Sequence, residues 1–269
     1  MPEHSADSLH LLSAAPPDLR KLLNGVELHP VEIGKTAACC VRLHPPGLGA
    51  CFLKVAPSRF GDTLVREREV TDWLQHKLPV PRVLYFGQAA EHDYLLTSEL
   101  PGVNACDGAL KSDIPKLVKT LAQGLRLIHS LPTQGCPFDQ ALATRLAEAR
   151  QRVALGLVDE SDFEDEWLHL TAEEILSNLL ATQPTGEDLV FTHGDYCMPN
   201  VIVNSCELSG FVDWGSGGVA DRHQDLALAA RSLAYNWGEQ WVPLLFEEYG
   251  PTCVDQQKLY YFRLLDELF

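Results

Sequence analysis

The chain has 269 residues, 46% of them hydrophobic and 22% charged, which describes an ordinary globular protein with one large domain or two lobes. Its 37 acidic side chains outnumber the 21 basic ones, and the formal net charge of −16 disfavours binding to nucleic acid or anionic lipid. No apolar run is long enough to span a membrane, and the first residues lack a signal-peptide pattern. We therefore expect a cytoplasmic protein without membrane association.

The eight cysteines show no spacing that indicates cross-linking or metal binding. None forms a CxxC pair, and Cys39 and Cys40 are adjacent, which suits neither a disulfide framework nor a zinc site. Several lie in apolar runs, as Cys51 does, and are expected in the core. We expect no structural disulfide and no zinc.

The first part of the chain is predicted to form strands. A short amphipathic helix is expected at Pro17–Leu23, and antiparallel strands follow between Val26 and Val55. Gly34-Lys35-Thr36 resembles the end of a P-loop, but position 29 is His rather than Gly, and a strand rather than a helix follows. We reject a P-loop and expect a turn that folds over phosphates, with Thr36 as a donor.

Lys54 ends the predicted strand Cys51-Phe52-Leu53-Lys54. Burying a lysine is unfavourable unless it pairs with an anion, although a surface lysine reaching solvent would produce the same pattern. The helix predicted next, from Thr63 to Lys77, carries two acids that can supply this anion, Glu67 and Glu69. A Lys–Glu pair that reaches nucleotide phosphates is typical of the small lobe of kinases.

A domain boundary is predicted after two further strands. The second strand runs into Ser98-Glu99-Leu100-Pro101-Gly102, an extended linker. We expect an N-terminal lobe of residues 1–100, a hinge at about 98–102, and a C-terminal lobe of residues 101–269. Backbone groups in such a linker can hydrogen-bond the edge of an adenine.

Beyond the hinge, apolar residues at helical spacing predict mostly helices. They are expected at Ile114–Leu131, about 140–154, about 171–182, about 238–249 and 255–268. His129 in the first helix is expected to be a capping or core residue. An acidic segment at about 157–168 is either a solvated charge run or a lid that binds a polycation.

The strongest functional signal lies in Leu189–Gly215. Two apolar runs flank the loop His193-Gly194-Asp195-x-x-x-x-Asn200, and a third run ends in Asp213-Trp214-Gly215. Kinases use this spacing to place one Asp near the acceptor hydroxyl and an Asn and a second Asp on Mg²⁺. Such residues can also merely bond turns, but two motifs in order, each after an apolar run, favour phosphoryl transfer. Asp225, at the start of the next helix, is expected to cap that helix or bond the loop.

From about Val26 to Phe269 the chain resembles the aminoglycoside 3′-phosphotransferases, kinases of antibiotic resistance. The motifs that carry the resemblance are FLK, KLPVPRVLYF, LLTSELPG, CPFD, GLVDESDFEDE, THGDYCMPN, SGFVDWG, ADRHQDLALAARS and YFRLLDELF. The resemblance implies an α+β, bilobal protein-kinase-like fold with ATP between the lobes. The N-terminal lobe would hold a small antiparallel sheet, and the larger C-terminal lobe would be mostly helical.

The resemblance also implies roles for single residues. Asp195 would orient or deprotonate the substrate hydroxyl, and Asn200 and Asp213 would bind Mg²⁺. The implied ATP contacts are a lysine for the phosphates, its glutamate partner, an aromatic that stacks on adenine, and two hinge residues: Lys54, Glu67, Phe52, Ser98 and Leu100. The implied substrate pocket comprises Asp162, Glu164 and Asp165 of the lid together with Arg231, Asp266, Glu267 and Phe269.

Three positions depart from the pattern common in that family. Ser216 follows the D-x-G motif where Arg is common, and Ser232 and Tyr235 stand where Asp and Glu are common. All three fall on the predicted substrate wall, and none on the nucleotide or metal residues.

We expect an ATP- and Mg²⁺-dependent kinase of the 3′-hydroxyl of a kanamycin- or neomycin-type aminoglycoside, acting as a monomer or weak dimer. The carboxylates of the pocket would meet the ammonium groups of this small cationic substrate. One alternative is a kinase of another hydroxyl substrate, such as streptomycin at its 3″ position or a metabolite amino alcohol or sugar. The other alternative is a non-catalytic, kinase-like binding protein.

Overall fold

The computed structural model describes residues 14–31, 39–58 and 63–269, so the predicted turn at Gly34–Ala38 and the predicted donor Thr36 lie outside the described residues. The chain divides into two compact units. Unit 1 comprises Met1–Ala105 and Pro199–Gly215, and unit 2 comprises Cys106–Met198 and Ser216–Phe269. In the part of the chain that is described, no helix has the length and apolar character needed to cross a membrane.

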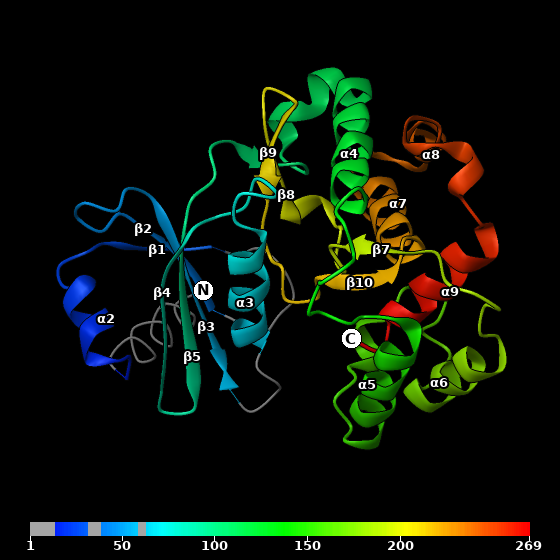
Figure 1. The fold of residues 1–269 in the computed structure, drawn as a ribbon, viewed down its shortest axis with the longest axis horizontal. Helices are drawn as coiled ribbons and strands as arrows, with labels where there is room; N and C mark the ends of the chain where they lie inside the picture. The colour runs from blue at the N-terminus through cyan, green and yellow to red at the C-terminus, as the bar shows by residue number, and fades with distance from the viewer. Residues whose placement is uncertain (1–13, 32–38, 59–62) are drawn as a thin grey trace. The chain divides into compact units, whose positions relative to one another are not determined.

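A five-stranded antiparallel sheet in the order β1-β2-β3-β5-β4 forms the centre of unit 1 (Figure 1). Its strands are β1 (Leu28–Pro30), β2 (Cys39–Leu43), β3 (Cys51–Pro57), β4 (Val83–Ala89) and β5 (His92–Ser98). Side chains alternate between the faces of a strand. In β3, Cys51, Leu53 and Val55 are therefore buried on one face, while Phe52 and Lys54 lie on the other.

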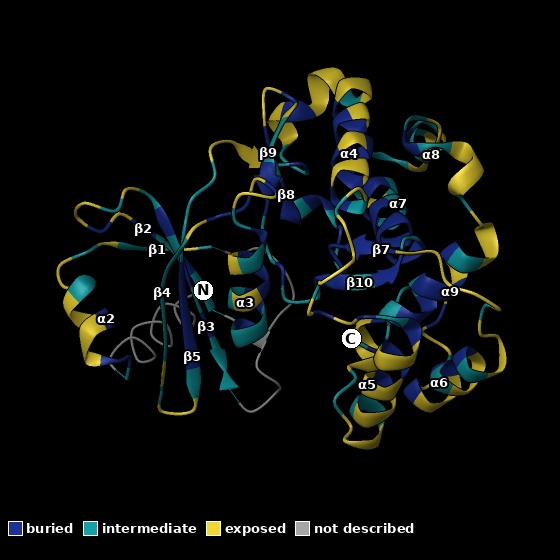
Figure 2. Ribbon diagram, in the orientation of Figure 1, coloured by how far each residue is buried: buried dark blue, intermediate teal, exposed yellow. Residues whose placement is uncertain are grey.

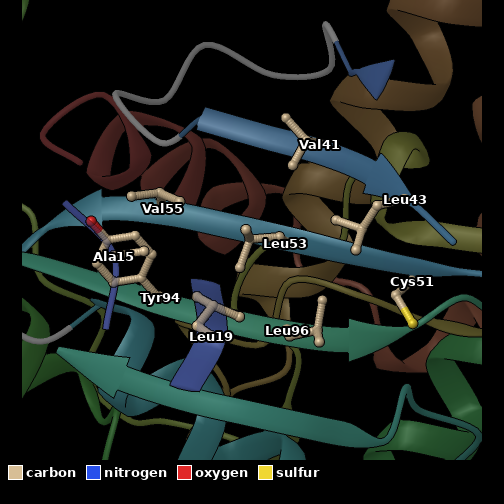
Figure 3. Packing of buried hydrophobic residues seen from close by; sticks show 9 residues of the cluster. All are labelled: Ala15, Leu19, Val41, Leu43, Cys51, Leu53, Val55, Tyr94 and Leu96. Atoms are coloured by element: carbon tan, nitrogen blue, oxygen red, sulfur yellow. The ribbon is translucent and has the colours of Figure 1, made fainter. Parts of the chain in front are cut away.

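The two faces of this sheet are covered differently. On the face that carries Leu53, Leu19 of α2 (Pro17–Leu22) joins a buried cluster with Tyr94 and Leu96 (Figure 3). Cys51 belongs to the same cluster, which confirms that it is a core residue. Helix α3 (Thr63–Leu74) contacts β3, β4 and β5, and its Glu67 reaches Lys54 on the other face.

A smaller antiparallel sheet, β6-β8-β9, also belongs to unit 1. It contains β6 (Val103–Asn104), β8 (Val201–Asn204) and β9 (Glu207–Phe211). The N–H of Phe211 donates to the carbonyl of Pro79 at 3.0 Å, so β9 is tied to the segment that follows α3. Gly210 permits this approach, because a Cβ there would lie only 2.4 Å from the same carbonyl oxygen.

Unit 2 is mostly helical and contains one two-stranded antiparallel ribbon (Figure 1). Its helices are α4 (Ile114–His129), α5 (Leu142–Ala154), α6 (Ala172–Ala181), α7 (His223–Trp237), α8 (Val242–Tyr249) and α9 (Gln256–Asp266). The ribbon pairs β7 (Leu189–Thr192) with β10 (Gly218–Asp221). Helix α4 packs on α8, and α7 packs on α9. The predicted apolar stripe of α4 is buried, and the buried side of the helix is visible in Figure 2.

Antiparallel sheets and segregated helices confirm the α+β class expected from the sequence. The predicted helices all form, with ends shifted by a few residues. The strand β10 was not predicted, because its four residues Gly-Val-Ala-Asp show no alternation of polar and apolar side chains. The side chain of His129 is 3% exposed, as expected for a core histidine.

Candidate active site

Lys54 lies between two carboxylates in unit 1. Its Nζ is 2.9 Å from Oε1 of Glu67 and 2.9 Å from Oδ1 of Asp213. Burial disfavours the charge on Lys54, but Asp213 and Glu67 outweigh this effect and raise the lysine pKa above its ordinary value. Lys54 is therefore a permanent cation whose two partners come from α3 and from the end of β9. Phe52 shares its face of β3, two residues away, which is a span of about 6.7 Å in an extended strand.

Local backbone structure brings Asp213 and Asn200 together. The N–H of Val212 donates to the carbonyl of Asn200 at 3.0 Å, so the residue before Asp213 is bonded directly to Asn200. Asp213 adopts a positive φ of 67°, unusual for a residue other than glycine. The next residue, Trp214, is fully buried and donates its indole N–H to the carbonyl of Phe211. This anchored turn orients Asp213.

The pair fits a magnesium site. A carboxylate and an amide supply hard oxygen donors, and Mg²⁺ is usually held by one or two such protein groups together with nucleotide phosphates. Asn200 is buried, whereas the side chain of Asp213 is 42% exposed, so its carboxylate remains accessible to a ligand.

The hinge residues lie at the end of β5. The N–H of Ser98 donates to Arg82 and that of Glu99 donates to Ala50, at 2.9 Å each, so successive backbone groups point to opposite sides. Arg42 holds the Glu99 side chain through three hydrogen bonds of 2.9 to 3.2 Å. A groove of about 420 Å³ borders this segment, lined by Leu48, Ala50, Arg82, Ser98, Glu99 and Pro101.

In unit 2, the carboxylate of Asp225 hydrogen-bonds the backbone of the turn His193-Gly194-Asp195, which we call the HGD turn. The N–H groups of His193 and Gly194 each donate to a different carboxylate oxygen of Asp225, at 2.8 Å. This confirms the expectation that Asp225 bonds the loop. Gly194 has a φ of +82°, and a Cβ there would lie 2.1 Å from the carbonyl oxygen of Ser216. No larger residue fits this position without moving the backbone.

A second layer of polar groups fixes Asp225 itself. Nε2 of His129 lies 3.0 Å from Oδ2 of Asp225, and Nδ1 of His129 lies 2.8 Å from the hydroxyl of Tyr249. Arg222 donates to the same hydroxyl at 3.0 Å. All polar atoms of the fully buried Asp225 carboxylate are thus engaged, as a buried charge requires.

The acidic segment, residues 157–168, is docked rather than free. Phe163 and Trp167 are buried, while Asp162 and Asp165 are exposed. Glu164 differs from these two acids, because its carboxylate contacts Arg231 at 3.4 Å and Arg263 at 2.5 Å. Of the three predicted lid acids, Asp162 and Asp165 are therefore exposed, and Glu164 is held by Arg231 and Arg263 within unit 2.

Arg231 links this segment to helix α9. Its guanidinium lies 2.7 Å from Oδ2 of Asp266 and donates to the sulfur of Cys197 at 3.9 Å. The N–H of Cys197 in turn donates to the carbonyl of Asp195 at 2.9 Å. Burial raises the pKa of Asp266, the guanidinium of Arg231 opposes the rise, and the negative charge of Asp195 adds to it. Arg231, Asp266 and Asp195 thus belong to one charge cluster.

The C-terminal residues are held by helix α5. Arg152 donates to the carbonyls of Leu268 and Phe269, at 2.7 Å each, and the guanidinium of Arg145 lies 3.4 Å from the centre of the Phe269 ring. Glu267 accepts the N–H of Glu164 at 3.0 Å. Burial raises the pKa of Glu267 to about 7.

The three departures from the family pattern occupy different environments. Tyr235 is 88% exposed. Ser216 provides the carbonyl that packs against Gly194. Ser232 is buried, and its hydroxyl accepts the N–H of Met198 at 2.9 Å. The placement of Ser232 on a substrate wall is therefore wrong, because its hydroxyl faces the interior and supports the loop after the HGD turn.

Sequence reasoning missed Arg263, Arg145, Arg152 and Cys197. Arg263 precedes the terminal Leu-Leu-Asp-Glu motif by one residue and resembles an ordinary surface arginine of α9. Its partner Glu164 lies 99 residues away, and no local pattern indicates so distant a contact.

Comparison with known proteins is consistent with this arrangement. The profile of the phosphotransferase enzyme family matches residues 41–262. An aminoglycoside 3′-phosphotransferase of Niallia circulans is 40% identical over 255 residues, covering 94% of this chain and 97% of that protein. A crystal structure of an aminoglycoside 3′-phosphotransferase of type VIII matches with a TM-score of 0.88 at 36% identity, over 97% of this chain and 100% of that chain. A 3″-type aminoglycoside phosphotransferase of Streptomyces rimosus, solved with ADP and streptomycin, matches with a TM-score of 0.78 at 28% identity, over 93% of this chain and 97% of that chain.

The sheet of unit 1, the helices of unit 2 and these structural matches define a kinase-like phosphotransferase fold, and they confirm the bilobal architecture expected from the sequence. The chain belongs to the aminoglycoside phosphotransferase family.

Proposed function

We propose that the protein phosphorylates the 3′-hydroxyl of an aminoglycoside of the kanamycin or neomycin type, with ATP as donor and Mg²⁺ as cofactor, and thereby confers resistance. The observation that carries the proposal is the position of Lys54 between Glu67 and Asp213. A cation held in this way is suited to nucleotide phosphates, and a purely structural salt bridge would not require the exposed second carboxylate. Family membership and a 3′-phosphotransferase relative at 40% identity support the aminoglycoside as acceptor.

The nucleotide would bind to unit 1. Lys54 would hold the α- and β-phosphates, with Glu67 keeping its ammonium in place. Phe52 would stack on the adenine, and Ser98 and Leu100 would bond its edge through backbone groups. We retain the division into a nucleotide-binding lobe of residues 1–100 and a catalytic and substrate-binding lobe of residues 101–269 as part of this proposal.

Asn200 and Asp213 would hold the magnesium ion. When bound, Mg²⁺ neutralises the charge that develops on the transferred phosphoryl group. The protein contributes the anchored turn at Trp214, which holds the Asp213 carboxylate in an accessible position.

Asp195 would orient the acceptor hydroxyl. The hydroxyl oxygen attacks the γ-phosphorus, the bond from this phosphorus to the β–γ bridging oxygen breaks, and ADP leaves with the electron pair. The proton of the hydroxyl passes to Asp195 or to the transferred phosphate. Because the transition state is loose, orientation by Asp195 contributes more than strong basicity. The bonds from Asp225 to the HGD turn supply this orientation.

The substrate would meet the acidic side chains of unit 2. Asp162 and Asp165 are exposed, and Asp266 and Glu267 stand at the end of α9, where Glu267 accepts the N–H of Glu164. Ammonium groups of an aminoglycoside are complementary to such carboxylates. The formal net charge of −16 would also attract a polycation from solution.

An ADP-release assay tests the proposal. Purified protein with Mg·ATP is offered kanamycin, neomycin, streptomycin and a simple amino alcohol in parallel, and ³¹P NMR of the product identifies the hydroxyl that is phosphorylated. ADP release with kanamycin or neomycin, and phosphate on the 3′-oxygen, supports the proposal. Release with streptomycin alone identifies a 3″ kinase instead. Absence of both turnover and Mg·ATP binding identifies a non-catalytic binding protein.

A further inference from the structure

We propose that the ion pair between Arg42 and Glu99 is a brace for the nucleobase: it fixes the ring of Phe52 and the hinge, and so controls the affinity for the base but not for the phosphates. Arg42 and Glu99 are positioning residues in this view. That the base lies on Phe52 rests on the proposed function, whereas the brace itself is a feature of the sheet of unit 1.

The ion pair has a directional geometry. Nε of Arg42 donates to both carboxylate oxygens of Glu99 at 3.2 Å, and Nη2 donates to Oε2 at 2.9 Å. A planar guanidinium that binds a carboxylate through two nitrogens fixes the orientation of both side chains as well as their separation. The side chain of Glu99 is 24% exposed and that of Arg42 is 42% exposed. The pair is therefore an ordered part of the sheet, although solvent reaches it.

This ion pair crosses the start of β3 on the face that carries Phe52 and Lys54. Arg42 lies on β2 and Glu99 directly follows β5, and both strands are neighbours of β3. Arg42 is the partner of Phe52 in the β2–β3 register, and residues directly opposite one another share a face of the sheet. The N–H of Glu99 donates to the carbonyl of Ala50 at 2.9 Å, so Glu99 lies opposite the residue that precedes β3.

Phe52 therefore lies between two ion pairs on one face of the sheet. Lys54, with its partner Glu67, is two residues further along β3, a span of about 6.7 Å. The Arg42–Glu99 pair runs from the level of Phe52 toward the start of the strand. Side chains of directly opposite residues are close enough to touch, so the stem of Arg42, held at its far end by Glu99, restricts the ring of Phe52. The order along β3 is thus brace, base and phosphates.

The same ion pair fixes the hinge. Glu99 stands between Ser98 and Leu100, the two residues whose backbone groups would bond the base. It is held at its backbone by Ala50 and at its side chain by Arg42, so the hinge is tied to the residues before β3 and to β2. Ala50 and Glu99 also belong to the lining of the groove of about 420 Å³ along this segment. A ring and a hinge that are ordered before binding lose less entropy when they take up the base.

Replacing each partner separately distinguishes a brace from an effect of charge. If Arg42 acts on the nucleotide only through its positive charge, Arg42→Gln weakens the binding of the phosphates and Glu99→Gln strengthens it. If the pair is a brace, both substitutions weaken the binding of the base. The double variant then matches either single variant, because all three break the same contact.

The experiment measures binding to the full chain by calorimetry, without an acceptor. The ligands are Mg·ADP, adenosine and inorganic tripolyphosphate with Mg²⁺, at about 0.15 M salt, where exposed charges more than roughly 8 Å apart are screened. Arg42→Gln and Glu99→Gln are each expected to raise the Kd for Mg·ADP and for adenosine about fivefold, the effect of one partly exposed ion pair, and to leave the Kd for tripolyphosphate near that of wild type. Glu69→Gln is the control, because it breaks an ion pair of the same 2.9 Å length on α3 and should bind all three ligands as wild type does.

Two further variants test the geometry of the contact. Arg42→Lys keeps the charge but lacks the planar fork, and should give an intermediate Kd for adenosine. The exchange R42E/E99R restores a pair of opposite charges and should bind adenosine more tightly than R42E alone, and melting curves identify any variant that fails to fold.

The outcomes separate the brace from the proposed function. An unchanged Kd for adenosine in Arg42→Gln, or an equal rise in the Kd for tripolyphosphate, overturns the brace alone. Wild-type protein that binds neither Mg·ADP nor adenosine overturns the proposed function and the brace with it. Wild-type protein that binds Mg·ADP but phosphorylates no aminoglycoside contradicts the proposed acceptor, and the Kd values of the variants still decide the brace.

Discussion

The ammonium group of Lys54 is equidistant from two carboxylates, at 2.9 Å from Glu67 and 2.9 Å from Asp213, but these carboxylates differ in exposure. The side chain of Glu67 is 7% exposed and that of Asp213 is 42% exposed. We infer that Glu67 is the permanent partner of Lys54, and that Asp213 is the partner that a metal ion and a nucleotide can engage.

Replacing Lys54 by Met should therefore remove the positive charge that we propose binds the nucleotide phosphates. We expect kcat/KM for ATP to fall by about 100-fold, comparable to the loss of one preorganised charge-stabilising donor. The substitution also leaves Glu67 buried without its cation, which lowers the free energy of unfolding. The double variant K54M/E67Q separates the two effects: stability should recover and activity should not. Recovery of activity in the double variant would contradict a phosphate role for Lys54.

Replacing Asp195 by Ala tests the orientation of the acceptor. We expect kcat to fall by roughly 10²- to 10⁴-fold, because a positioned acid–base group is lost. Binding of Mg·ATP, measured by calorimetry, should change little, since the proposed nucleotide contacts are all in unit 1. Turnover near the wild-type rate would refute the assignment.

Asp225→Asn tests whether the HGD turn must be held. An asparagine offers one acceptor oxygen in place of two, so one of the N–H groups of His193 and Gly194 loses its partner. A buried unpaired donor costs about 2 kcal/mol, and the free energy of unfolding in urea should fall by that amount. We expect kcat to fall more than the KM for ATP. Asp255→Asn, at the start of α9, is the control, since Asn caps a helix as well as Asp.

Glu267 should make stability depend on pH. Its pKa is raised by burial from an ordinary 4.5 to about 7, so between these values the folded protein binds more protons than the unfolded chain. The free energy of unfolding must then fall as pH rises from about 4.5 to 7. Glu267→Gln should reduce this fall by roughly 1 kcal/mol, a figure lowered to allow for solvent screening at a half-buried group. Thermal melts at pH 5 and pH 8 measure it, and equal pH responses of variant and wild type would contradict the expectation.

Salt should act on the two substrates differently. Asp162 and Asp165 are exposed, so salt screens their attraction to a cationic substrate once the Debye length falls to about 8 Å or less. We therefore expect the KM for the aminoglycoside to rise steeply between low and moderate salt, while the KM for ATP responds less. Initial rates over a salt series provide the test. An equal response of both constants would count against acidic recognition of the substrate.

Several features of the candidate site could be predicted from residue order because they depend on local structure. Asp195 and Asp213 each follow a short apolar run, and Asn200 directly precedes the run Val201–Val203. The fold class followed from strands before the hinge and helical periodicity after it. The two possible roles of Asp225 were also accessible, because an acid at the start of a helix can accept backbone N–H groups of that helix or of a nearby loop.

Other contacts depend on how distant segments pack. Glu67 and Glu69 are two residues apart on α3, so their side chains point about 200° apart around the helix. Only the packing of α3 on the sheet decides that Glu67 is buried against Lys54, while Glu69 pairs with Arg68. Ser232 was assigned to the wrong surface because sequence spacing does not reveal which side of α7 faces the loop at Met198.

The sequence by itself therefore determined the family, the order of the catalytic motifs and the acidic character of the chain, since these follow from residue types and short spacings. Only the tertiary structure decided how far each of these acids is exposed. Glu164, Asp162 and Asp165 are equivalent in the sequence. They differ in exposure because the packing of unit 2 brings Arg263, 99 residues further along the chain, against Glu164.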